Sequence, residues 1–150
     1  MSSRPAPPID LDRFLPYRLD ILAQKVSGGL SRIYKERYGL GVPEWRVLAH
    51  LGQYAPITAR AIGAHSRMHK TKVSRAVAEL ETRGLLSRAD NPGDRREDLL
   101  QLTAKGRDAY ADLAPRAAAF AKELMAGFSA AERRAFEGGI DRLLSKLGED

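Results

Sequence analysis

The 150-residue sequence contains no cysteine, which excludes disulfide scaffolds, cysteine-ligated metal sites and thiol redox sensors. It also lacks a run of 18 apolar residues, the length that a transmembrane helix needs. The first ten residues are rich in proline and have no apolar segment of the kind found in secretory signals. We therefore expect a cytoplasmic protein with no membrane partner, in which residues 1–12 form a flexible arm.

Signatures of catalysis are missing as well. No glycine-rich phosphate loop follows a predicted strand, no nucleophile elbow is present, and the carboxylates are scattered over predicted helix surfaces. His65 and His69 have a spacing that can hold a metal on one helix, but here it spans a predicted turn without a nearby carboxylate or third histidine. We expect neither an enzyme nor a cofactor or metal site.

Positive charge is in excess, with 25 Lys and Arg against 19 Asp and Glu, and a net charge of +6. The excess is concentrated in residues 60–77, which hold five basic residues and no acidic one. Such a stretch is typical of phosphate binding, but a solvated basic face has the same composition. Geometry has to separate the two interpretations.

Apolar residues recur every three or four positions in most of the chain, which predicts helices. A proline at 43 suits the first turn of a helix, Thr58 and Ser129 suit N-caps, and Gly84 suits a helix end. Ser129 and Glu132 have the spacing of a capping box. The predicted helices span about residues 15–37, 43–54, 59–64, 69–83, 103–124 and 130–147, with a short link over residues 65–68.

Two short apolar runs, residues 85–88 and 99–102, flank a turn-rich loop over residues 89–94 and predict a β-hairpin. A helix-turn-helix followed by a hairpin is a winged helix. The predicted fold is therefore mainly α with a small hairpin wing, and the winged helix-turn-helix spans about residues 43–103. The flanking helices, about 13–38 and 103–148, carry more apolar surface than a small domain needs. A two-fold dimer would bury it, and a monomeric helical core is the alternative.

The predicted helix over residues 69–83 has two distinct faces on a helical wheel. One face is small, polar and basic, and the other is apolar: Val73, Ala76, Val77 and Leu80. Small side chains let a helix enter the major groove, and a long donor such as Arg75 can bind a guanine edge. We predict that its polar neighbours bind bases or phosphates: Arg67, His69, Lys70, Thr71, Lys72 and Ser74. An ordinary amphipathic surface helix is the alternative.

A second predicted contact lies at the hairpin tip, where Asp94, Arg95 and Arg96 precede the second strand. An arginine on a wing can enter the narrow, negative minor groove. A carboxylate two residues earlier can hold its guanidinium in a defined orientation. A loop with scattered charge is the alternative.

From about Leu15 to Leu147 the chain resembles the MarR family of winged-helix transcriptional regulators. The resemblance lies in residues 38–48, 70–86 and 94–106, where an Asp-x-Arg wing leads into Leu-Thr-x-x-Gly. It implies a homodimer on a palindromic operator, with Ser74 and Arg75 in recognition-helix positions and Arg96 at the wing tip. Many members are repressors released by a small ligand, and members that sense peroxide use a cysteine that this chain lacks.

The resemblance also implies a cleft for an effector. The positions that match its lining are Tyr17, Arg18, Trp45, Arg46 and His50. Aromatic walls with an arginine and a histidine suit an aromatic carboxylate or its CoA thioester. A core role for Trp45, and an ion pair of Arg46 with Glu44 or Asp20, are the alternatives.

The sequence thus predicts a sequence-specific transcriptional regulator whose partners are double-stranded DNA, a second copy of the chain and a small-molecule effector. A non-specific DNA-coating protein would share the basic face and would show no preference for an operator.

Overall fold

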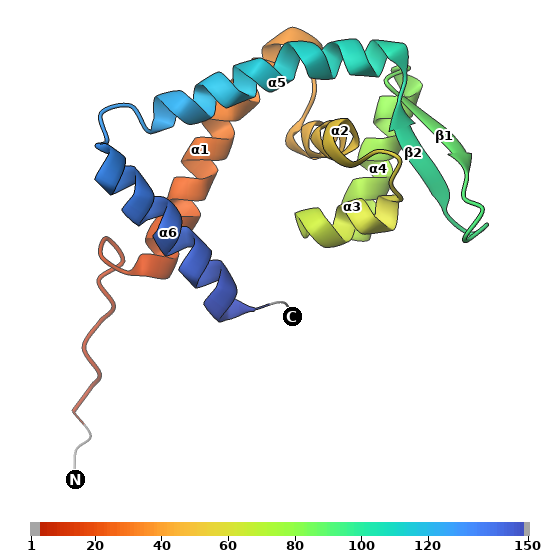
Figure 1. The fold of residues 1–150 in the computed structure, drawn as a ribbon. Coiled ribbons are helices and arrows are strands. Elements are labelled where there is room, and N and C mark those ends of the chain that lie inside the picture. Colours follow the sequence, from red (N-terminus) through yellow and green to blue (C-terminus); the bar gives the residue numbers. More distant parts are fainter. Residues whose placement is uncertain (1–3, 149–150) are drawn as a thin grey trace. The chain divides into compact units, whose positions relative to one another are not determined.

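The computed structural model describes residues 4–148, which form helices and one β-hairpin (Figure 1). The elements are α1 (Leu15–Tyr38), α2 (Val42–Tyr54), α3 (Ala59–Ser66), α4 (Lys70–Thr82), β1 (Leu86–Asp90), β2 (Asp98–Leu102), α5 (Ala104–Leu124) and α6 (Ala130–Leu147). The chain divides into two compact units, the first ending at Ala114 and the second beginning at Pro115, inside α5.

The core of the first unit joins α2, α3, α4, the hairpin and the facing ends of α1 and α5. Its side chains are almost fully excluded from solvent, among them Tyr34, Leu40, Leu48, Ile62, Leu80, Leu100 and Leu113. The strands pair antiparallel with Leu86 opposite Leu102. The segment after α2 extends the hairpin by one residue, because Ile57 and Leu100 exchange two backbone hydrogen bonds of 3.2 and 2.8 Å. These elements, α2 to α4 with the hairpin, form a winged helix-turn-helix, here called the winged lobe.

The helix ends follow the signals in the sequence. The Thr58 side chain caps α3 by accepting from the Ala61 N–H, and Ser129 and Glu132 form the predicted capping box at α6. The backbone N–H of Ser129 lowers the pKa of the Glu132 carboxyl because it donates to the ionised form. Gly84 follows α4 with a φ of 73°, a conformation that glycine adopts without steric cost. The predicted helices and hairpin are therefore confirmed.

Two predicted boundaries are wrong by a few residues. The link predicted over residues 65–68 is shorter, because His65 and Ser66 belong to the last turn of α3. The hairpin loop starts later than predicted, since β1 continues to Asp90, paired with Asp98. In both cases hydrogen bonds that extend a regular element outweigh the local turn propensity of its last residues.

The first turn of α5 lies unusually close to the start of the hairpin. The Thr103 hydroxyl donates to the Gly84 carbonyl oxygen at 2.6 Å and accepts from the Gly106 N–H at 3.0 Å. A side chain at Gly106 would overlap the carbonyl oxygen of Leu85. Glycine at this position is therefore required by the close approach of two backbones.

Apolar side chains remain exposed on the helices outside the winged lobe. On α1 and the segment before it these are Leu11, Phe14, Leu15, Tyr17, Leu19 and Leu22. In the second unit, α6 contains no buried residue, and its exposed apolar residues are Phe136, Ile140, Leu143, Leu144 and Leu147. Leu144 and Leu147 are 67% and 75% exposed, and with the other three residues they form an apolar stripe along α6 that faces solvent.

Candidate DNA-binding surface

Helix α4 separates a buried face from an exposed one. Val73, Ala76, Val77 and Leu80 are each no more than 2% exposed and pack into the core. The opposite face carries the residues predicted to contact DNA: Thr71, Lys72, Ser74 and Arg75, all exposed, with the small Ala78 beside them. Within residues 4–148, no hydrogen bond or ion pair engages the side chains of Lys70, Lys72 or Arg75. The two-faced helix is thus as predicted, and its long cations can reach a ligand.

The N-terminus of α4 is capped by a histidine. The His69 Nδ1 atom accepts a hydrogen bond from the Thr71 N–H at 3.2 Å. This bond places the ring proton on Nε2, the atom that remains available as a donor. The residues before the cap form a tight turn in which Arg67 has a φ of 57°, a left-handed conformation that is uncommon outside glycine. The cap and the turn place Arg67 and His69, both exposed, beside the positive end of the helix dipole.

At the hairpin tip, one arginine is held by one aspartate. Asp94 accepts hydrogen bonds from the Arg96 backbone N–H at 3.0 Å, from Nε at 3.1 Å and from Nη2 at 3.3 Å. These bonds lower the pKa of the Asp94 carboxyl, the side-chain bond most strongly, and the nearby charge of Arg60 acts in the same direction. The Arg96 side chain stays 90% exposed, and Arg95 is exposed as well. The predicted Asp–Arg pair is present, with its cation directed to solvent.

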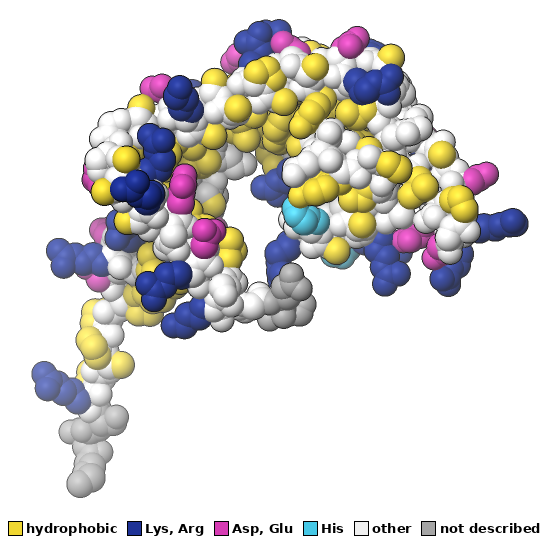
Figure 2. Space-filling model, in the orientation of Figure 1, with side chains coloured by type: hydrophobic (Ala, Val, Ile, Leu, Met, Phe, Trp, Pro, Cys, Tyr) yellow, Lys and Arg dark blue, Asp and Glu magenta, His cyan; other side chains and the backbone are white. Residues whose placement is uncertain are grey.

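The structure adds one basic residue to this surface. Arg60, in the first turn of α3, lies near Asp94 and lines a hollow of about 570 Å³ with Lys70, Ser74 and Glu97. Figure 2 shows Lys and Arg side chains gathered along the lower edge of the winged lobe, below α3 and at the hairpin tip. The signal in the sequence was the acid-free stretch of residues 60–77, to which Arg60 belongs.

The residues predicted for an effector site fall into two groups. Trp45, Arg46 and His50 lie on α2, and the Trp45 ring stacks on Tyr34 of α1, with centroids 5.2 Å apart and planes within 9°. Tyr17 and Arg18 lie in the first turn of the 24-residue helix α1. The rise of an α-helix places them about 25 Å from Tyr34 along the axis. One chain therefore does not bring all five residues to the same point.

The α2 group includes a cluster of rings that the sequence did not reveal. His50 Nδ1 lies 2.6 Å from the Arg46 carbonyl oxygen, and His50 Nε2 lies 2.9 Å from Nδ1 of His65 on α3. The Tyr54 ring contacts both imidazoles. His65 thus pairs with His50 and not with His69. In the described part of the chain, no three His, Asp or Glu side chains gather as a metal site would require.

Three comparisons place this fold among known proteins. Residues 38–97 match a family model described as the MarR family. The HTH-type transcriptional regulator YwoH of Bacillus subtilis (strain 168), itself uncharacterised, is 30% identical over 101 residues, which cover 67% of this chain and 73% of that protein. A MarR/EmrR family regulator from Acinetobacter sp. ADP1 has 26% identity and a TM-score of 0.82, covering 93% of this chain and 98% of the other. CouR from Rhodococcus jostii RHA1, solved with p-coumaroyl-CoA bound, has 24% identity and a TM-score of 0.76, covering 89% and 93%.

The fold and these matches define a winged helix-turn-helix transcriptional regulator. The chain belongs to the MarR family. Members of this family are DNA-binding regulators and not enzymes, and they also bind small-molecule ligands. Within residues 4–148, no helix is both long and apolar enough to cross a membrane.

Proposed function

We propose that the protein is a repressor that binds a palindromic operator as a homodimer and leaves it when a small aromatic ligand binds. The single observation that carries this proposal is the exposed face of α4, where small side chains surround one long cation, Arg75, that has no partner within residues 4–148. A helix with this face can lie deep in the major groove.

The proposed contacts divide into base reading and positioning. Arg75 reaches a guanine edge with two hydrogen bonds, and Thr71 and Ser74 bind bases or phosphates beside it. The cations and the histidine at the start of α4 bind phosphates, helped by the helix dipole: Arg67, His69, Lys70 and Lys72. Each wing inserts Arg96 into the minor groove, and Asp94 fixes the orientation of its guanidinium. Arg95 lies near the sugar-phosphate backbone of the DNA.

The proposed dimer rests on the exposed apolar surface of α1 and α6. Residues 13–38 and 103–148 serve as dimerisation helices, residues 43–103 as the winged DNA-binding part, and residues 4–12 as an arm. The first three residues of the predicted arm, 1–3, lie outside the described residues. A second copy of this chain is the occupant that relieves the exposure of Leu144 and Leu147. Two-fold symmetry then places two copies of α4 about one DNA turn, roughly 34–36 Å, apart, which requires a palindromic site.

The effector is proposed to be an aromatic carboxylate or its CoA thioester. CouR, which shares this fold, was solved with p-coumaroyl-CoA. The stacked Trp45 and the ring cluster at His50 offer an aromatic wall, and Arg46 offers a cation. Because Tyr17 and Arg18 lie about 25 Å away along α1, they join this wall through a second subunit or through a ligand as long as an acyl-CoA. A difference of only ~1–3 kcal/mol in ligand affinity between two states changes DNA affinity about tenfold to a hundredfold.

A binding assay separates this proposal from a non-specific DNA-coating protein. Labelled DNA from upstream of the gene and a scrambled sequence of equal length are titrated with the protein at physiological salt. The proposal predicts that two chains bind the upstream DNA at least about a thousandfold more tightly than the scrambled DNA. Equal affinities for both DNAs would favour the non-specific alternative.

The ligand step has its own test. Aromatic acids and their CoA thioesters are first screened by thermal shift, because a bound ligand raises the apparent stability. A compound that binds is then added to the operator complex. We expect it to release the DNA from the unmodified protein and to fail with Arg46→Ala or His50→Ala, while both variants keep their DNA affinity. Full release from both variants would remove these residues from the effector site.

A further inference from the structure

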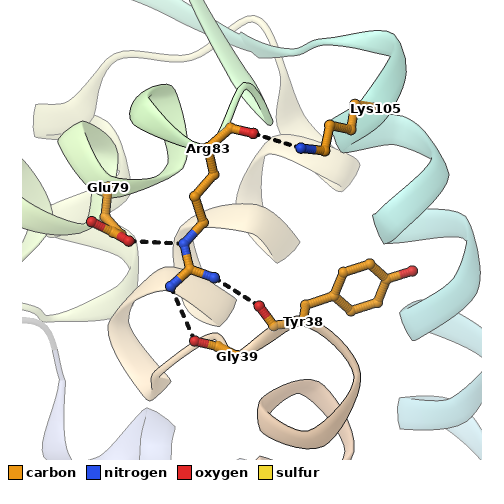
Figure 3. A network of polar contacts seen from close by, with 5 residues as sticks. All are labelled: Tyr38, Gly39, Glu79, Arg83 and Lys105. Atoms are coloured by element: carbon orange, nitrogen blue, oxygen red, sulfur yellow. Dashed lines mark hydrogen bonds and ion pairs between the residues drawn. The ribbon is translucent and has the colours of Figure 1, made fainter.

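One arginine at the end of α4 joins three separate parts of the first unit (Figure 3). The Arg83 guanidinium donates to Glu79 on α4 at 2.8 Å, to the carbonyl oxygen of Tyr38 at 2.7 Å and to that of Gly39 at 3.2 Å. Its own carbonyl oxygen accepts a hydrogen bond of 2.9 Å from Lys105 Nζ on α5. Arg83 therefore ties the end of α4 to the end of α1, and its backbone ties α4 to α5.

The hydrogen-bond acceptors at the end of α1 explain why an arginine occupies this position. Helix α1 ends at Tyr38, and Gly39 follows with a left-handed φ of 63°, so the last carbonyl oxygens have no donor within the helix. Two such acceptors on neighbouring residues match the rigid, planar fork of a guanidinium, which keeps its charge at any physiological pH. The remaining donor, Nε–H, binds the Glu79 carboxylate, which holds the guanidinium in place. A lysine has three donors on one nitrogen at the end of a flexible stem, so it can bind a carbonyl oxygen but cannot reproduce this planar arrangement.

Packing closes this joint on one side only, where Tyr34 and Leu40 are buried in the core. A crevice of about 360 Å³ borders it, lined by Tyr38, Arg83, Leu85, Lys105, Asp108 and Ala109. Open space beside the joint means that the two helix ends are not locked by close contacts on that side. On this open side the end of α1 is joined to the end of α4 by the hydrogen bonds of Arg83.

We propose that Arg83 is a positioning residue for DNA recognition: it fixes α4 relative to the C-terminal end of α1. This inference rests on the proposed function, in which α1 contacts the second subunit and α4 enters the major groove. With 13 residues, α4 is about 20 Å long. A rotation of about 10° at Arg83 moves its other end by about 3 Å, and a base-reading hydrogen bond tolerates only a few tenths of an ångström.

Arg88 provides a matched control. Its side chain is 38% exposed, against 36% for Arg83, and it also pairs with carboxylates. Its partners, Glu81 and Asp98, both belong to the winged lobe, at 3.0 and 3.5 Å. Loss of Arg88 therefore removes a comparable set of polar contacts without touching the connection to α1.

The first test compares Arg83→Met, Arg83→Lys and Arg88→Met in binding to operator and to scrambled DNA, with thermal melting as a measure of folding. We expect Arg83→Met to weaken operator binding at least about tenfold while scrambled-DNA binding changes less than about twofold. Arg83→Lys recovers part of the loss, because it keeps one carbonyl contact, and Arg88→Met leaves the ratio of the two affinities unchanged. Equal ratios for Arg83→Met and Arg88→Met would overturn the proposal.

The second test does not depend on an operator or on folding of the methionine variant. The chain has no cysteine, so Lys25→Cys on α1 and Ala78→Cys on α4 accept spin labels at unique places. The labelled chain is mixed with excess unlabelled chain, so that only distances within one subunit are measured. We expect a broader distance distribution with Arg83→Lys, and also with Arg83→Met if it folds, and no change with Arg88→Met. A distribution that Arg83→Lys leaves unaltered would refute the positioning role even if the protein bound no operator.

Discussion

Replacing Gly106 by alanine tests the close docking of α5 on the hairpin. A Cβ at this position would overlap the carbonyl oxygen of Leu85, and it would lie 2.9 Å from the carbonyl carbon. Carbon atoms normally approach to about 3.5–4.0 Å. Leu85 has no room to retreat, because it is 3% exposed and its N–H donates to the Leu80 carbonyl oxygen at 2.9 Å. The first turn of α5 must therefore withdraw by on the order of 1 Å.

The cost of that withdrawal follows from the contacts it disturbs. Overpacking costs about 1–3 kcal/mol. The hydrogen bond from the Thr103 N–H to the Leu85 carbonyl oxygen, 3.1 Å, and the one from the Thr103 hydroxyl to Gly84, 2.6 Å, are weakened, at about 1 kcal/mol for each bond lost. Alanine offsets about 0.5–1 kcal/mol because it is the better helix former. We expect a net loss of about 2–4 kcal/mol, which corresponds to a Tm roughly 4–16 °C lower.

The measurement is thermal unfolding followed by circular dichroism, with the same substitution at Gly28 as a control. Gly28 lies in α1, and a methyl group added to its Cα would have no heavy atom within 4 Å. There the alanine should leave the Tm unchanged or raise it by a few degrees, roughly 1–4 °C. A Gly106→Ala protein that melts within about 2 °C of the unmodified chain would show that the two backbones do not approach so closely at Leu85.

Three further predictions concern the DNA-binding surface and the dimer. The lowered pKa of Asp94 means that its bonds to Arg96 are complete above the ordinary carboxyl pKa and are lost only as the pH falls through the lowered value. The 13C chemical shift of the Asp94 carboxyl carbon should therefore stay constant from pH 8 to 5, and Asp94→Ala should weaken operator binding about two- to fivefold because Arg96 loses its fixed orientation. An Asp94 carboxyl shift that already changes near pH 6 would contradict this. His69→Ala should lower the free energy of unfolding by about 1 kcal/mol, because the cap of α4 is lost. His69→Asn should regain this stability in thermal melting but not the DNA affinity in anisotropy titrations. A restored affinity would mean that the histidine only caps the helix. Leu144→Glu with Leu147→Glu should convert a dimer into a single subunit in sedimentation, and a monomeric parent protein would rule out the proposed dimer.

Local patterns were enough to predict the elements and the two faces of α4. The spacing of Val73, Val77 and Leu80 places all three on one face of a helix, and in the structure all three are buried. Caps at Thr58 and Ser129 were predictable for the same reason, since donor and acceptor lie within three residues of each other.

Contacts between distant residues could not be predicted in this way. The His50–His65 pair has no signature in the sequence, because no fixed spacing joins two residues on different helices. The contact of Arg83 with Tyr38 has none either, because its acceptor is a backbone carbonyl oxygen, which every residue has. The tight approach at Gly106 was visible only as part of the family-like Leu-Thr-x-x-Gly pattern, without its physical reason. The separation of Tyr17 from Trp45 could have been inferred, because a helix predicted over residues 15–37 is already too long to bring both to one point.

The ratio of operator to scrambled-DNA affinity in Arg75→Ala and Lys72→Ala tests the central claim most directly. Both residues are exposed cations on α4, so both substitutions remove one charge from the same surface. If Arg75 reads a base, its loss should lower operator affinity by about 1–3 kcal/mol, roughly 5- to 150-fold, and change scrambled-DNA binding little. Loss of Lys72, which is proposed to contact a phosphate, should weaken binding to the operator and to scrambled DNA by the same factor. Equal losses on both DNAs for Arg75→Ala would contradict the assignment of α4 as the helix that reads the operator.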